Sequence, residues 1–155
     1  MRTCLAILIL APVFAFADTK PEEKKLELTD EEKGVLDRTN AERKAAGLPE
    51  LVPNAKLFQA ARDHSTNMAK QGRMSHVLDG RTHTERAAAA GYPYAYLGEN
   101  IAWNQRDATE VVECWMRSAG HRANILSRNY TEIGLGVAVN ERGERFWTQV
   151  FGSGR

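Results

Sequence analysis

The sequence predicts an α+β fold, in which helices cover a small antiparallel sheet. Four segments between residues 29 and 120 carry helix-capping residues, and residues 133–139 alternate with the two-residue rhythm of a strand. A turn and a second strand follow, which together form a hairpin near the end of the chain. Strands that lie after and between helices favour either a general α+β arrangement or an α/β/α sandwich.

Capping residues predict the first two helices. Thr29 and Glu32 form a capping-box pattern, and Gly47 supplies a stop for the helix that follows them. Asn54 can cap a second helix, which ends at about residues 71–72. Positions i, i+4, i+7 and i+11 on one face of this second helix hold Leu57, Ala61, His64 and Met68.

Two further helices are predicted before residue 120. Thr82 with Glu85 repeats the capping box, and Gly91 closes this short helix. Asp107 opens the next helix, and Gly120 is expected to end it and to leave His121 at the break. Its predicted buried stripe consists of Val111, Val112, Trp115, Met116 and Ala119.

The last third of the chain changes to a strand pattern. Branched residues at 133, 135, 137 and 139 alternate with Gly134, Gly136, Ala138 and Asn140. A strand face made of Gly and Ala lets another backbone approach closely, and the simplest such neighbour is a packed helix. Residues 140–143 form the predicted turn, and residues 144–152 form the returning strand.

The first residues predict export from the cell. Residues 1–17 have the pattern of a signal peptide, with cleavage near Ala17. Residues 18–27 are charged and are expected to form a mobile leader, and residues 28–155 form a single domain. We therefore expect a protein that is secreted, extracellular or periplasmic, without a transmembrane anchor.

The charge balance bears on the possible partners, and the cysteine content bears on how the fold is stabilised. Removal of Arg2 with the signal peptide leaves 20 Lys+Arg against 20 Asp+Glu, a balance that argues against nucleic acid as a partner. Only Cys114 remains, so an internal disulfide is excluded and the hydrophobic core must supply the stability. Cys114 lies beside the predicted buried stripe and is interpreted as a structural residue.

Three ionisable residues each follow a predicted secondary-structure element and could converge on one site: His76, Glu99 and His121. Two imidazoles and a carboxylate can bind Zn²⁺ and leave a position open, or the carboxylate can orient a histidine that acts as a general base. Alternatively, Glu99 only satisfies backbone groups in a turn, and His121 only complements a helix dipole. The sequence contains no HExxH motif that would settle the choice.

Other candidate residues have less support. Ser118 lies three positions before His121 and could meet it, but no GxSxG motif surrounds it. His64 falls on an apolar helix face and is expected to be a hydrogen-bonded core residue, whereas His83 is expected to be exposed.

The stretches MSHVLDG, AAAAGYPYAYLGENIAWN, VVECWMRSAGHRANIL, EIGLGVAV and FWTQVFG together resemble the CAP, or SCP, superfamily over about residues 32–152. The resemblance implies a three-layer α-β-α sandwich with about four helices and a small, mainly antiparallel central sheet. It also implies a cleft lined by two histidines and two acidic residues, in which three positions fall on His76, Glu99 and His121. Ser118 replaces the fourth acidic residue of plant and animal members. Asp79 or Glu85 could supply the missing carboxylate, although neither matches the motif.

Superfamily members are associated with sterol or lipid binding, with a divalent metal at the two histidines and, in some cases, with proteolysis. We therefore expect a monomeric binding module, whose cleft holds a small molecule, a lipid or a cell-envelope component. His76 and His121, with Glu99, are the predicted ligands for Zn²⁺ or another divalent cation. The alternative is an extracellular hydrolase or peptidase, with His76 or His121 as base, Glu99 as its orienting group and water or Ser118 as nucleophile. A third possibility is that these residues only hold loops together.

Overall fold

Five helices and four strands make up the described part of the chain, residues 25–154, in the computed structural model. In chain order they are α1 (Asp30–Ala45), β1 (Val52–Pro53), α2 (Ala55–Gln71), α3 (His83–Ala89), β2 (Tyr94–Trp103), α4 (Ala108–Arg117), α5 (Ala119–Ile125), β3 (Glu132–Val139) and β4 (Arg145–Gly154). The predicted signal peptide, residues 1–17, lies outside the described residues.

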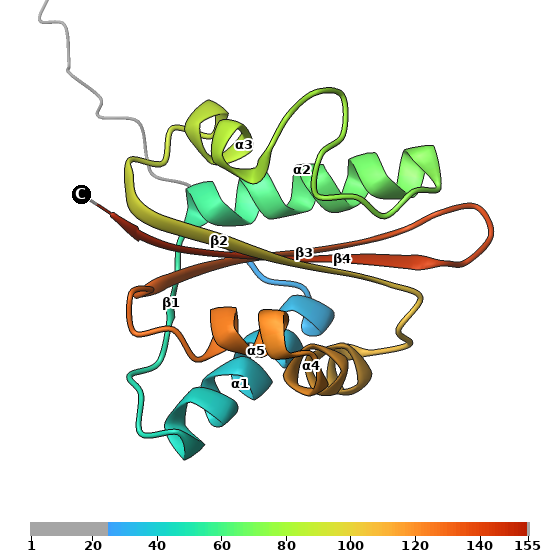
Figure 1. Cartoon of the computed structure of the whole chain (residues 1–155). Helices are drawn as coiled ribbons and strands as arrows, with labels where there is room; N and C mark the ends of the chain where they lie inside the picture. Colours follow the sequence, from blue (N-terminus) through green and yellow to red (C-terminus); the bar gives the residue numbers. More distant parts are fainter. Residues whose placement is uncertain (1–24, 155) are drawn as a thin grey trace, which may run out of the picture.

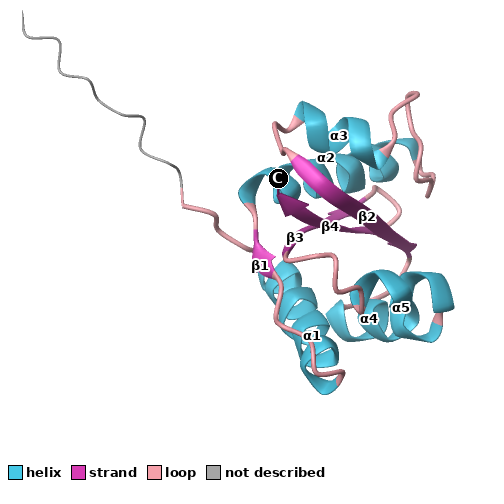
Figure 2. Ribbon diagram, turned by 60° about the vertical axis from the view of Figure 1, so that its left-hand side comes forward, coloured by secondary structure: helices cyan, strands magenta, loops and turns pink. Residues whose placement is uncertain are grey.

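The strands form one sheet in the order β1-β3-β4-β2. The short β1 pairs with β3 in parallel, and the other two pairings are antiparallel. Helices α2 and α3 cover one face of this sheet, and α1, α4 and α5 cover the other (Figure 1). A view turned by 60° shows the same three layers (Figure 2). The predicted α+β class and α-β-α sandwich are thereby confirmed.

Local capping fixes where the helices begin, as the sequence predicts. Thr29 and Glu32 exchange both bonds of a capping box before α1, and Thr82 and Glu85 do the same before α3. The side chains of Asn54 and Asp107 accept backbone N–H groups at the starts of α2 and α4. These bonds satisfy donors that the first helical turn leaves without partners.

Two glycines of β3 allow α2 to lie directly against the sheet. A Cβ atom added to Gly134 would lie 2.0 Å from the carbonyl carbon of Leu57. One added to Gly136 would lie 2.5 Å from the carbonyl carbon of Ala61. The bare face predicted for this strand is therefore the face on which α2 packs. This close contact fixes the position of the side chains on α2 relative to the sheet.

A buried arginine connects the layer of α1, α4 and α5 to the loop before β3. Arg43, on α1, is 1% exposed and donates hydrogen bonds to the backbone carbonyls of Pro49, Ile125, Ser127 and Tyr130. Burial lowers its pKa. Three of these carbonyls lie at the end of α5 and in the loop after it, where they would otherwise lack donors, and the fourth lies in the loop after α1.

Strand β2 forms one edge of the sheet, and side chains occupy the backbone carbonyls along that edge. Asn104 N–H donates to the Arg145 carbonyl, and hydrogen-bonded pairs recur at every second residue of an antiparallel ladder. The odd-numbered residues of β2 therefore direct their carbonyls away from β4. The carbonyls of residues 97, 99 and 101 accept hydrogen bonds from Tyr130 Oη, Asn124 Nδ2 and Trp115 Nε1, respectively.

The predicted fourth helix is divided into two, which raises the helix count from about four to five. Ser118 has an extended backbone, with φ −94° and ψ 120°, and separates α4 from α5. Gly120 was expected to end the helix, but it lies inside α5 and His121 follows it within that helix. The break at Ser118 turns the chain so that α5 continues beside α4 along the same face of the sheet.

The ordered contacts of the domain begin before Leu28, the predicted start. Leu26 packs against the core, and Arg62 donates a hydrogen bond to the Glu27 carbonyl, so the end of the predicted leader is attached to α2.

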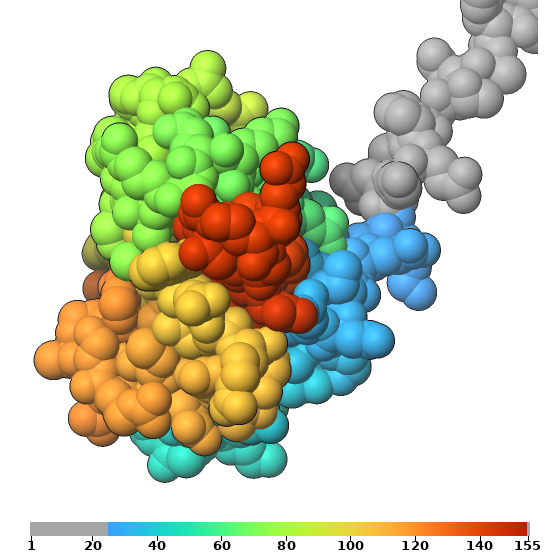
Figure 3. Space-filling model, turned by 90° about the vertical axis from the view of Figure 1, so that its right-hand side faces the viewer, coloured from blue at the N-terminus to red at the C-terminus, as the bar shows by residue number. Residues whose placement is uncertain are grey.

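A space-filling view shows the sheet between the two helical layers. In Figure 3 the red β3–β4 hairpin lies between the green α2–α3 layer and the yellow and orange segments. Within residues 25–154, none of the helices is long and apolar enough to cross a membrane.

Candidate functional site

A buried carboxylate holds the two charged groups at the centre of the candidate site. Glu99 Oε1 lies 2.9 Å from His76 Nδ1, and Glu99 Oε2 accepts a 2.6 Å hydrogen bond from Arg86 Nη2. The Glu99 side chain is only 1% exposed, whereas that of His76 is 53% exposed. Arg86 also donates to the backbone carbonyls of His76 and Arg81, which fixes the loop that carries the imidazole.

The electrostatics of this cluster keep Glu99 ionised. Burial raises its pKa, but hydrogen bonding from His76 and the positive charge of Arg86 outweigh burial, so the net pKa lies below its usual value. An ionised Glu99 accepts a hydrogen bond from the Nδ1–H group of His76. In the neutral form of the ring, this hydrogen bond leaves the lone pair on Nε2.

His121 approaches the cluster from the other layer of the molecule. Side chains alternate along β2, so Glu99 faces the α2–α3 layer while Asn100 faces α5. Asn100 Nδ2 donates to the His121 carbonyl, and His121 Nδ1 is buried without a hydrogen-bond partner within residues 25–154. Burial and the charge of His76 both lower the pKa of His121. The three predicted residues are thus arranged around the outer edge of β2.

A chain of buried amides supports the backbone at His121. Asn100 Nδ2 also donates to Gln149 Oε1, and Gln149 Nε2 donates to Thr39 Oγ1 on α1. Asn124 Nδ2 donates to Asn100 Oδ1 as well as to the Glu99 carbonyl. Because these bonds join α1, β4, β2 and α5, they fix the position of α5 relative to Glu99.

The other predicted acidic and nucleophilic candidates lie elsewhere. Asp79 accepts hydrogen bonds from Asn67 and Gln71 of α2, and Glu85 is used in the capping box of α3. Ser118 is half-buried, and its side chain forms no capping bond to α5. Neither Asp79 nor Glu85 provides a second carboxylate beside Glu99, and Arg86 is the charged neighbour of that residue instead.

The donor set does not favour a three-ligand metal site. Both Glu99 oxygens are already bonded, one of them to a guanidinium that would repel a cation. Among the described residues, no group of three or more His, Cys, Asp or Glu is placed to hold a metal ion. The imidazoles of His76 and His121 remain the donors that could bind a divalent ion, and that role stays a prediction from the sequence.

All four histidines of the chain lie near this cluster, although the sequence pointed to only two of them. Glu99 acts electrostatically on His64 and His83 as well as bonding to His76. His83 was predicted to be exposed, but it is half-buried, and burial lowers its pKa because α3 lies beside Glu99. His64 is buried as predicted, but its ring nitrogens have no hydrogen-bond partner of good geometry in the described chain.

Acid is expected to destabilise the fold through His64. Burial is the main cause that lowers its pKa from 6.5 to about 4, although Glu99 and the Ser75 backbone favour its protonation. The folded state therefore binds fewer protons than the unfolded state, so this contribution to stability is complete above about pH 6.5 and is lost as the pH falls through 4. It corresponds to about 3 kcal/mol.

Urea unfolding of the wild type and of His64→Leu at pH 7 and pH 4 measures this contribution. The free energy of unfolding should fall less with pH in the variant, by roughly 2–3 kcal/mol. His83→Gln serves as a control with a less buried ring and should change the pH dependence less. Equal pH dependence in the wild type and His64→Leu would show that His64 titrates normally in the folded protein.

Arg86 is the site residue that sequence reasoning missed. It lies in the alanine-rich segment of α3 and belongs to no recognised motif, so its contact with Glu99 depends on the tertiary fold. Asn100 and Asn124 also lie beside the site, and the structure shows them bonded to each other. The only sign of this in the sequence is that both are Asn, whose amide side chain can satisfy buried backbone groups.

Comparisons with known proteins identify the family of the chain. Over residues 36–151 the chain matches the CAP model, described as the cysteine-rich secretory protein family. It is 40% identical over 121 residues to the Bacillus subtilis protein YkwD and 34% identical over 129 residues to the B. subtilis membrane protein YlbC. These matches cover 77% and 83% of this chain but only 46% and 36% of those proteins, so the chain spans less than half the length of either relative.

Solved structures show the same architecture. An outer surface protein of Borrelia burgdorferi matches with a TM-score of 0.78 at 18% identity, covering 84% of this chain and 97% of that one, which supports the fold alone. An extracellular SCP-domain protein of Bacillus anthracis matches with a TM-score of 0.70 at 29% identity, covering 83% of this chain and 45% of that one. With the family model spanning most of the sequence, the chain belongs to the cysteine-rich secretory protein family.

Proposed function

We propose that this protein is an extracellular binding module that recognises a polar cell-envelope ligand through His76. The observation that carries the proposal is the exposed His76 ring, which is fixed on its Nδ1 side by the buried Glu99 carboxylate. A fixed imidazole presents Nε2 in one orientation and loses little conformational entropy on binding. The predicted signal peptide and the extracellular Bacillus anthracis relative support the location.

The charges around His76 favour a polar ligand over a lipid. Glu99, Arg86 and His121 surround the imidazole with groups that form hydrogen bonds or carry charge. Burial of the exposed His76 imidazole against an acyl chain or a sterol would cost free energy, because its Nε2 would lose water without gaining a hydrogen-bond partner.

Co-sedimentation with insoluble peptidoglycan tests this proposal. The wild type should sediment with the polymer, and His76→Gln, which lacks the imidazole, should be retained about tenfold less, as expected from the loss of one specific hydrogen bond. Lys44→Gln, at the far end of α1, is the matched control and should behave like the wild type. Equal retention of His76→Gln and the wild type, or no retention of either, would overturn the proposal.

The cation predicted at this site is tested with Zn²⁺ alone. Calorimetric titration at pH 7.5 should show binding that weakens at pH 5, because protonated imidazoles do not bind metal. His76→Ala and His121→Ala should each reduce that binding. Binding that is unchanged by acid and by both substitutions would place the cation elsewhere.

A hydrolase is the second candidate, and the Glu99–His76 pair is the observation that favours it. A carboxylate on Nδ1 orients an imidazole so that Nε2 can accept a proton from water. However, neither His76 nor His121 has a hydrogen bond to a serine or threonine hydroxyl within the described residues, which argues against Ser118 as nucleophile. Cleavage of a peptide library that disappears in the His76→Ala/His121→Ala double variant would establish hydrolysis in place of simple binding.

A further inference from the structure

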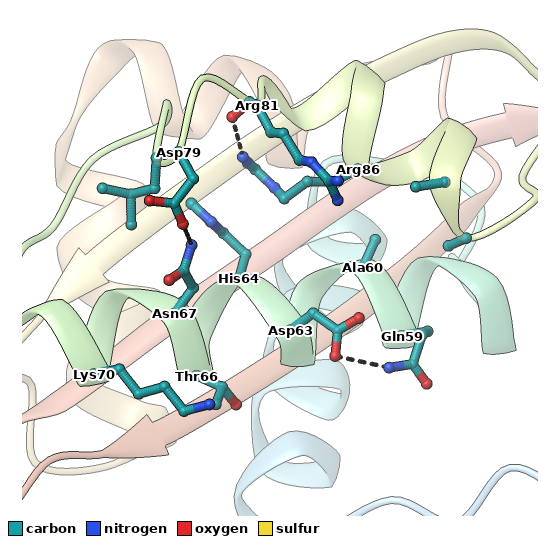
Figure 4. Close-up of a pocket in the computed structure, with 13 residues that line it drawn as sticks. Gln59, Ala60, Asp63, His64, Thr66, Asn67, Lys70, Asp79, Arg81 and Arg86 are labelled. Carbon is teal, nitrogen blue, oxygen red and sulfur yellow. Dashed lines mark hydrogen bonds between the residues drawn. The ribbon is translucent and has the colours of Figure 1, made fainter.

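A cavity lies beside the His76 site, between α2 and the segment that runs from Leu78 through α3. We call it the α2–α3 pocket; its volume is about 630 Å³, and its lining includes Asp63, His64, Lys70, Asp79, Arg81 and Arg86 (Figure 4). His76, Glu99 and His121 do not line it. This volume lies within the range of small-molecule sites, roughly 300–1,000 Å³.

Charged groups of both signs line the pocket without neutralising one another. Asp63 accepts a hydrogen bond from Gln59, and Asp79 accepts hydrogen bonds from Asn67 and Gln71, all of them uncharged amides. Within residues 25–154, neither Lys70 nor Arg81 forms a side-chain ion pair. Two carboxylates and two cations thus stay separate in one cavity, so a ligand that carries both charges could pair with each.

His64 adds a buried polar group to the wall of this pocket. Figure 4 shows its ring extending from α2 towards the segment that carries Arg86. The side chain is 1% exposed, and neither ring nitrogen has a hydrogen-bond partner of good geometry among the described residues. Because both ring nitrogens are covered, His64 forms part of the pocket wall, and the contacts to a ligand fall to the charged side chains that line the pocket.

The residues that line the pocket also indicate which ligands fit least well. None of the described residues that line the pocket is Phe, Tyr or Trp, so a sugar ring or a nucleobase would find no aromatic surface for stacking. An acyl chain would bury Asp63 and Arg81 without partners. A compact ligand with separated positive and negative groups avoids both costs.

We propose that the α2–α3 pocket binds the zwitterionic backbone of an amino acid or short peptide. The carboxylate pairs with Arg81 or Lys70, and the ammonium group pairs with Asp63 or Asp79. Both contacts are charge-assisted hydrogen bonds, which are stronger than neutral ones. This site is separate from the peptidoglycan contact proposed for His76, and either can exist without the other.

NMR titration of the purified protein with L-alanyl-L-alanine tests the proposal directly. Ring resonances of His64 and amide resonances of residues 78–86 should shift in a saturable manner. N-acetyl-L-alanyl-L-alanine lacks the ammonium group and the dipeptide amide lacks the carboxylate, so each should bind roughly tenfold more weakly. Equal affinity for all three compounds, or the absence of saturable shifts, would overturn the proposal.

Matched substitutions locate the two contacts. Arg81→Gln and Asp63→Asn should each weaken dipeptide binding roughly tenfold or more, since each removes one charged partner. Arg128→Gln and Asp37→Asn remove the same charges outside the pocket and should leave binding unchanged. His76→Ala should also leave it unchanged, which distinguishes this site from the proposed envelope contact. Unaltered binding in both pocket variants would refute the assignment, and the two modified dipeptides test it even if a variant fails to fold.

Discussion

Gly134→Ala is expected to destabilise the protein by about 4 kcal/mol or more and to lower its Tm by at least roughly 12 °C. The added Cβ would lie 2.0 Å from the Leu57 carbonyl carbon and 2.3 Å from the Phe58 nitrogen. These are backbone atoms of α2, so no side-chain rotation can relieve the overlap. The helix must move away from the sheet, and the contacts between α2 and β3 weaken along their length.

Gly120→Ala is the matched control for this experiment. Gly120 lies in α5, has no heavy atom within 4 Å of an added Cβ and does not require a positive φ. Alanine should therefore be neutral or should stabilise the protein by up to about 1 kcal/mol. Thermal unfolding followed by circular dichroism compares the two variants, and a Gly134→Ala protein as stable as the wild type would show that α2 does not pack as closely as described.

Arg86→Met is expected to cost about 3–5 kcal/mol, because it leaves a buried carboxylate without its cation. The Glu99 side chain is 1% exposed and that of Arg86 is 10% exposed, so water cannot easily replace the guanidinium. The pKa of Glu99 should rise, so acid should remove less stability from Arg86→Met than from the wild type, because protonation neutralises the unpaired carboxylate. Urea unfolding measures the free energy, and carboxyl carbon NMR measures the titration of Glu99.

A double variant separates the charge effect from lost packing. Glu99→Gln in the Arg86→Met background removes the unpaired charge and should recover part of the lost stability. Arg117→Met removes an arginine from an exposed pair, with side chains 68% and 61% exposed, and should change stability by less than about 1 kcal/mol. No recovery in the double variant would mean that Arg86 acts through packing alone.

Features that depend on neighbouring residues could be predicted from the sequence. The capping residues Thr29, Asn54, Thr82 and Asp107 lie where the structure places the helix starts, because a cap bonds to residues two or three positions away. The alternation of residues 133–139 predicted β3 for the same reason, since the period of two is a local property.

Features that depend on distant contacts were missed. Glu99 was predicted to follow a secondary-structure element, but it lies inside the ten-residue strand Tyr94–Trp103, whose pairing partner, β4, begins more than forty residues later. The short β1 depends likewise on β3. The break between α4 and α5 falls at Ser118, a residue type that does not by itself indicate the end of a helix. Arg86 joins the site only because the fold brings α3 against β2.

The bonds along the outer edge of β2 have a consequence for the behaviour of the protein at high concentration. An open strand edge is a template on which another chain can add its own strand, and aggregation can begin there. Here Tyr130, Asn124 and Trp115 already occupy three carbonyls of that edge. The opposite edge strand, β1, has two residues and one of them is Pro53. A strand added along β2 could not use these three carbonyls, and β1 offers little backbone for pairing, so both features limit intermolecular β-pairing.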